Sequence, residues 1–248
     1  MFDLTLLEWV VIVFSAMLIG FSKAGVASMG ILVVTIFMII FPARESVGIL
    51  LPLLIAGDIF AVTYYRKNVV WKYLFSLVPS VLAGILAGYA VLSFVTSEQL
   101  KPMIGILILV LILLHISRDR LGEKFNQMLP ESRFFTFVMG ALAGFATMIG
   151  NAAGGVMAIY FLVKGLPKKE FVGTGAWFFL FVNLIKVPFY ISLGIITLES
   201  ITFNLWLIPA ILIGAVIGVK VLKVMPQRLF QILVLVFAAI GAVRLIIG

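Results

Sequence analysis

The chain has 248 residues, of which 64% are apolar and 11% are charged, with a formal net charge of +8. Soluble domains are about 45–50% apolar, so this composition excludes a water-soluble globule and predicts an all-α integral membrane protein in a lipid bilayer. There is no cysteine and one histidine, His115, which excludes disulfides, cysteine-ligated metals and histidine clusters for zinc. We therefore expect no cofactor and no bound metal.

Ten apolar stretches follow one another along the chain, and we interpret the first as a retained helix, not a cleaved signal peptide. A polar segment, residues 117–132, separates five stretches from five. The sequence thus predicts one transmembrane domain with a first repeat (1–116), a cytoplasmic linker (117–132) and a second repeat (133–248). The stretches lie near 4–21, 25–41, 46–65, 71–95, 101–116, 133–149, 152–163, 170–194, 202–222 and 227–247.

Three pairs of similar segments occur in the same order in the two halves. They are AGVASM (24–29) with AGFATM (143–148), PARESVG (42–48) with PKKEFVG (167–173), and PSVLAGILAGYAVL (79–92) with PAILIGAVIGVKVL (209–222). An odd number of stretches per half turns the second half upside down in the membrane. We therefore predict two inverted repeats with a substrate site between them, as in many secondary transporters.

The basic residues are concentrated in the loops after the third, fifth, seventh and ninth stretches. These loops lie on one side of the membrane if the stretches alternate in direction, and the positive-inside rule makes that side cytoplasmic. Both termini are then expected outside the cytoplasm, with the protein in the cell membrane. The same rule accounts for the positive charge, which therefore does not indicate a nucleic-acid partner.

The first similar pair lies at two junctions rich in Gly and Ala, residues 20–30 and 143–155. The stretch after the second junction, 152–163, would be about 18 Å long as a helix, too short for a hydrocarbon core of about 30 Å. We therefore predict re-entrant hairpins or broken helices, with about 8–10 membrane segments in total. The alternative is ten full spans in which the small residues only allow close packing.

Three charged residues lie within or beside apolar stretches: Lys23, Asp58 and Lys186. A charge at the membrane midplane costs about 2.5–3.5 kcal/mol on insertion scales, so each requires a partner or a polar cavity. One hypothesis makes Lys23 or Lys186 the counter-charge of an anionic substrate and Asp58 a carrier of a coupling proton. The alternatives are an Asp58–Lys186 ion pair and a Lys23 that lies at a cytoplasmic turn.

The candidate substrate-binding residues lie at the two junctions and on the eighth stretch, where hydroxyl, amide and backbone N–H groups could bind an anion. For the hydroxyl and amide residues, helix capping is the alternative. The small residues of 84–88, 140–144 and 214–218 predict close helix packing. The candidates are Lys23, Gly25, Ser28, Gly144, Thr147, Asn151, Asn183 and Lys186.

These features resemble the sulfite exporter TauE/SafE family over essentially the whole chain. The resemblance rests on GFSKAGVASMG (20–30), GALAGFATMIGNAAGG (140–155) and the PARESVG/PKKEFVG pair. It implies a permease for sulfite or for an organosulfur anion such as a sulfonate or sulfoacetate.

From the repeats, the polar junctions and the lysines, we predict a secondary transporter of a small anion that works by alternating access. The coupling ion, a proton or sodium, and assembly into a homo-oligomer are left open. An anion channel, a carrier of a non-sulfur anion, and a membrane sensor or assembly subunit are the alternatives. An enzyme is not expected, because the single histidine has no G-x-S-x-G elbow around it.

Overall fold

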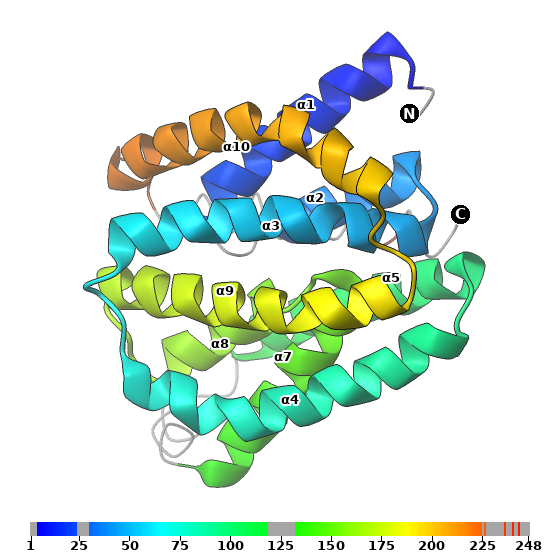
Figure 1. Ribbon diagram of the computed structural model, residues 1–248. Helices are drawn as coiled ribbons and strands as arrows, with labels where there is room; N and C mark the ends of the chain where they lie inside the picture. Colours follow the sequence, from blue (N-terminus) through cyan, green and yellow to red (C-terminus); the bar gives the residue numbers. More distant parts are fainter. Residues whose placement is uncertain are drawn as a thin grey trace.

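A computed structural model describes residues 4–23, 30–118 and 132–224, together with the single residues 226, 236, 240 and 243. Within these ranges the regular structure is helical (Figure 1). Most of the linker, the first AGVASM segment and most of the tenth stretch lie outside the described residues. The helices are α1 (Leu6–Lys23), α2 (Gly30–Ile40), α3 (Ala43–Tyr65), α4 (Trp71–Phe94), α5 (Ser97–Arg118), α7 (Arg133–Gly150), α8 (Gly154–Val163), α9 (Lys168–Ser192) and α10 (Leu198–Val224).

Six of the described helices are long and apolar enough to cross a membrane: α1, α3, α4, α7, α9 and α10. The all-helical membrane fold expected from composition is therefore confirmed. By contrast, α2 has 11 residues and α8 has 10, which corresponds to about 15–17 Å of helix. Neither crosses a core of about 30 Å alone, so the short length expected after the second Gly/Ala junction is confirmed.

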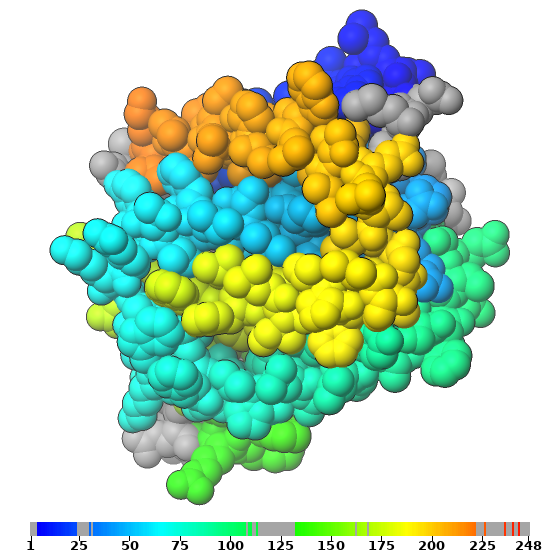
Figure 2. Space-filling model, in the orientation of Figure 1, coloured from blue at the N-terminus to red at the C-terminus, as the bar shows by residue number. Residues whose placement is uncertain are grey.

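The described helices form two layers. In Figure 1, α10, α3, α9 and α4 lie side by side in the front layer, and Figure 2 shows their side chains as adjacent bands over this face. Behind them, α1 packs along α10 and α7 packs along α4, with the short helices α2 and α8 between these pairs. The two layers enclose a continuous core, and α3 and α9 meet at its centre.

Glycines allow the two closest helix contacts. A Cβ atom at Gly84 of α4 would lie 2.1 Å from the carbonyl oxygen of Ala141 on α7, and one at Gly214 of α10 would lie 1.9 Å from that of Met17 on α1. No side chain fits at such distances, so the backbones approach directly, and the close packing expected from the small residues is confirmed. In the same two helix pairs, the partner helix also contributes a glycine: Gly144 of α7 lies against the backbone of Val81 on α4, and Gly20 of α1 lies against the backbone of Ile211 on α10.

Segments that lie far apart in the chain meet at each end of the molecule. At one end, the backbone N–H of Val70, after α3, donates to Thr174 Oγ1 near the start of α9 at 2.9 Å. At the other end, Arg44 at the start of α3 donates to the carbonyl of Val95 after α4. The basic α3–α4 loop therefore lies beside the start of α9, and the start of α3 lies at the opposite end.

Candidate functional site

A cavity lies between the end of α1, the start of α2, the junction of α7 with α8, and the central helices α3 and α9. Its empty volume is about 700 Å³, counting the space at its open mouth. The wall is mainly apolar, with aromatic rings from Phe161, Phe171 and Phe179. Its polar groups are few and come from the ends of α1 and α7 and from the middle of α9: Ser22, Lys23, Thr147, Asn151 and Asn183. Such a wall, apolar with a few convergent polar groups, is typical of small-molecule sites.

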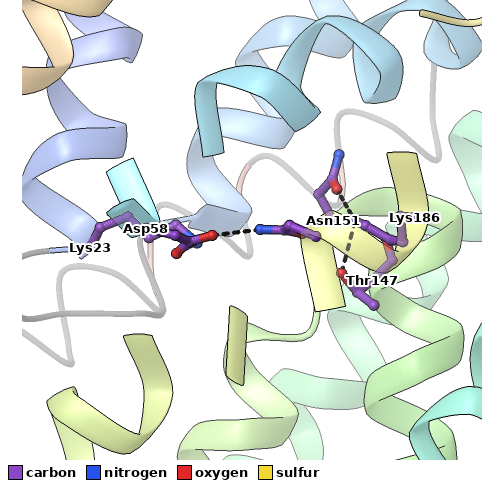
Figure 3. Close-up of polar contacts among 6 residues, drawn as sticks. Lys23, Asp58, Thr147, Asn151 and Lys186 are labelled. Atoms are coloured by element: carbon purple, nitrogen blue, oxygen red, sulfur yellow. Dashed lines mark hydrogen bonds and ion pairs between the residues drawn. The ribbon is translucent and has the colours of Figure 1, made fainter. Parts of the chain in front are cut away.

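One polar cluster joins α1, α3 and α9 at this cavity. Lys23 Nζ lies 2.6 Å from Asp58 Oδ1, and Asn183 Nδ2 donates to Asp58 Oδ2 at 2.7 Å (Figure 3). Asp58 is fully buried and Lys23 is 9% exposed. The Lys23 ammonium also lies 4.5 Å from the centre of the Phe179 ring, close enough for a cation–π interaction. The carboxylate is thus held between a cation and an amide donor.

A second polar cluster surrounds Lys186, which is fully buried on α9. Its ammonium donates to the Thr147 carbonyl at 2.9 Å, to the Thr147 hydroxyl at 3.0 Å and to Asn151 Oδ1 (Figure 3). Among the described residues no carboxylate lies within ion-pair distance of this ammonium. In the described part of the chain, the neighbours of the Lys186 amine are therefore neutral oxygens of the α7 end and the Tyr190 ring, whose centre lies 5.4 Å away.

The local sequence explains how the second cluster forms. Helix α7 ends at Gly150, and Asn151 takes the left-handed conformation with φ 53°, which Asn tolerates better than most residues. Its backbone N–H donates to the Thr147 carbonyl, and its side-chain Nδ2 donates to the Val47 carbonyl of α3 at 3.1 Å. The capping role considered for Asn151 is thus present in its backbone, while its amide side chain joins α3 to Lys186.

The next helix begins at the cavity. Gly154, the first residue of α8, is part of the cavity wall. The first N–H groups of a helix have no partner within that helix, and they carry partial positive charge. The start of α8 therefore adds N–H donors to the side chains of the cavity.

The two clusters place more basic than acidic groups around the cavity. Lys23 and Lys186 are two basic groups, whereas Asp58 is the one carboxylate among the described buried residues. Buried charges are costly unless they are paired. An anion in the cavity would supply the missing negative charge.

The structure brings most of the expected site residues together. Lys23, Thr147, Asn151 and Asn183 line the cavity. Asp58 and Lys186 lie behind this wall and bond to residues that form it.

One expectation needs correction, and two candidate residues lie outside the described residues. The alternative of an Asp58–Lys186 ion pair is wrong, because Asp58 pairs with Lys23 and Lys186 bonds to α7. Gly144 packs against Val81 at the α4–α7 contact, as the small residues of 140–144 predict, and it is not among the residues that line the cavity; its role in substrate binding stays a prediction. Gly25 and Ser28 lie outside the described residues.

Sequence reasoning missed two aromatic residues at the site. Phe179 lies over Lys23, and Tyr190 donates its hydroxyl to the Met148 carbonyl at 2.7 Å near the end of α7. Phe179, Asn183, Lys186 and Tyr190 follow one another at helical spacing on one face of α9. That spacing was the signal that could have identified them.

Comparison with known protein families shows to which family the chain belongs. The sulfite exporter TauE/SafE family model matches residues 12–245, nearly the whole chain. The comparisons with curated proteins and with solved structures find no match. The expected resemblance is confirmed over this range, and the chain is a multi-pass membrane protein that belongs to the sulfite exporter TauE/SafE family of transporters.

Proposed function

We propose that this protein is a secondary transporter of a small anion, namely sulfite or an organosulfur anion such as a sulfonate or sulfoacetate. Family membership supports the substrate class. The observation that carries the proposal is the excess of basic over acidic groups, two lysines against one carboxylate among the described residues, around one cavity.

We propose further that the transporter consists of two inverted repeats. In support, the first helix of each half packs along the fourth helix of the other half, α1 with α10 and α7 with α4. The glycines that allow these contacts are arranged alike in both pairs. The half-length helices α2 and α8 support broken or re-entrant segments at the midplane, where transporters of this plan bind substrate.

The anion binds in the cavity between the two junctions. The Lys23 ammonium supplies charge, the Thr147 hydroxyl and Asn183 amide supply hydrogen-bond donors, and the start of α8 adds backbone N–H groups. The apolar part of the wall, including Phe161 and Phe171, accommodates an organic portion of the substrate. The two repeats then rock against each other to expose the cavity to alternate sides.

Asp58 competes with the anion for Lys23. Its carboxylate lies 2.6 Å from the ammonium that would bind substrate. Protonation of Asp58 would release Lys23 toward the cavity and would allow a proton to travel with the anion. This assigns the coupling proton to Asp58.

Counterflow in proteoliposomes tests the proposal. Vesicles are loaded with unlabelled sulfite, sulfoacetate or sulfate, and uptake of trace labelled anion is measured. We expect saturable uptake with the wild type and with Lys220→Ala, which changes an exposed lysine of α10. We expect Lys23→Ala to reduce uptake about tenfold or more, as for the loss of a hydrogen bond to a charged group.

Removal of Lys23 alone leaves a buried carboxylate, so the double variant Lys23→Ala/Asp58→Asn is assayed beside it. We expect the double variant to be folded and still defective in uptake. Wild-type uptake rates in the folded double variant would refute the binding role of Lys23. Current without counterflow in wild-type vesicles would indicate an anion channel instead.

A further inference from the structure

We propose that the Lys186 ammonium is a tethered substitute for a free monovalent cation in an oxygen-lined site at the end of α7. The cation site itself is independent of what the protein transports. Its consequence, that anion transport needs no sodium, rests on the function proposed above.

The first support is the set of ligands around the ammonium. Three oxygens of three chemical kinds converge on it: the Thr147 carbonyl, the Thr147 hydroxyl and the Asn151 amide. Neutral oxygens of this kind are the ligands that proteins use for hard cations. An ammonium has three N–H donors, and each of the three is used here.

The second support is the way in which the charge is compensated. Lys186 is fully buried, yet the nearby carboxylate of Asp58 pairs with Lys23. The compensation comes instead from the carbonyl end of α7, which carries partial negative charge, and from the Tyr190 ring at 5.4 Å. In transporters with broken helices, the same kind of helix end coordinates sodium.

The third support is the position of the site at the junction of three helices. Asn151 accepts from Lys186 on α9 and donates to the Val47 carbonyl on α3. The cation therefore connects the end of α7 to both central helices. A free cation at this point would enter and leave during transport, whereas a lysine side chain remains in place through every cycle.

The test is cation-dependent stability of Lys186→Ala. This substitution removes the ammonium and leaves both the oxygens and the vacated space, whereas Lys186→Met fills the space without charge. Thermal unfolding of each purified variant is followed in choline chloride and in sodium, ammonium or methylammonium chloride at equal ionic strength. Lys220→Ala reports general salt effects.

We expect at least one small cation to stabilise Lys186→Ala in a saturable manner. A bound cation at ten times its dissociation constant should raise the unfolding temperature by about 3 to 6 °C over choline. The wild type, Lys186→Met and Lys220→Ala should show no such difference, because in them the site is filled or intact.

A folded Lys186→Ala that unfolds at the same temperature in all four salts would overturn the proposal. So would a Lys186→Ala that cannot be folded in any of them, because a small cation should then restore the site. In wild-type vesicles, counterflow should be equal in sodium and in choline media, and a sodium requirement would overturn the tethered-cation role. The stability assay contains chloride but no sulfite or organosulfur anion, so its result stands even if counterflow detects no transport.

Discussion

At the scale of single residues, the two buried lysines have different partners and different physical settings. Lys23 is paired with a carboxylate, and its neighbour Phe179 stabilises the charge from another side. Lys186 is held by neutral oxygens of α7. A substitution at Lys23 therefore leaves an unpaired charge, whereas a substitution at Lys186 leaves unpaired oxygens.

The Lys23–Asp58 pair makes a prediction about stability. Lys23→Ala should lower the free energy of unfolding by about 3 to 5 kcal/mol, because it leaves the Asp58 carboxylate buried without its cation. Lys23→Ala/Asp58→Asn should recover part of this loss, since an amide costs less to bury. Thermal unfolding of both variants and of Asp58→Asn completes a double-mutant cycle. Strictly additive effects would contradict a direct pairing.

At the scale of helices, the glycine contacts define which positions of the two halves correspond. Gly144 meets Val81 on α4, and Gly20 meets Ile211 on α10. Gly20 is therefore the counterpart of Gly144 in these contacts, although the similar hexapeptides of the sequence place Gly25 opposite Gly144. The alignment of the hexapeptides and the alignment of the helix contacts thus differ by five residues, the separation of Gly20 and Gly25.

In this alignment of the two halves, the two lysines occupy corresponding positions. Lys23 follows Gly20 by three residues, just as Thr147 follows Gly144. Each half therefore places one ammonium at the carbonyl end of its first helix, where the helix dipole favours a positive charge. In α1 the ammonium belongs to the helix itself, and at α7 it comes from Lys186 of α9.

The close helix contacts make a second prediction. Gly84→Ala and Gly214→Ala should both lower the unfolding temperature markedly, because the added methyl would lie about 2 Å from a backbone oxygen and force the helices apart. Gly175→Ala is the matched control, since its Cβ would meet Phe161 at 3.5 Å, an ordinary contact. Equal stability of all three variants would show that the helices separate without cost.

At the scale of the whole molecule, the layered arrangement places the charged loops at defined ends. The loop with Arg66 and Lys67 lies beside the start of α9, which is preceded by Lys164. The start of α5, with Glu98, follows the opposite end of α4. A protein with these ends on opposite sides of a membrane has its basic loops together, as the positive-inside rule expects.

Cysteine labelling tests this orientation, and the chain offers a cysteine-free background. Lys67→Cys and Glu98→Cys both change exposed residues. An impermeant maleimide should label Glu98→Cys in intact cells and Lys67→Cys only after permeabilisation. Lys169→Cys, on the second half, should behave like Lys67→Cys. Labelling in the reverse pattern would contradict the predicted orientation.

The sequence by itself determined the membrane environment, the helical class and the family, because these depend on composition, on long apolar stretches and on motifs that are local in the chain. It also singled out Lys23, Asp58, Thr147, Asn151, Asn183 and Lys186 as candidates, since charge and polarity inside apolar stretches are costly and therefore informative; their role in substrate binding stays a prediction.

Only the tertiary structure decided which of these residues are partners. The choice between Lys23 and Lys186 as the partner of Asp58 depends on how α1 and α7 approach α3 and α9, and residues far apart in the chain set those distances. It also showed which helix Gly144 packs against, because the backbone of α4 lies beside it at Val81. Side-chain pairing depends on distances of a few ångströms between helices, and no spacing along a single helix encodes them.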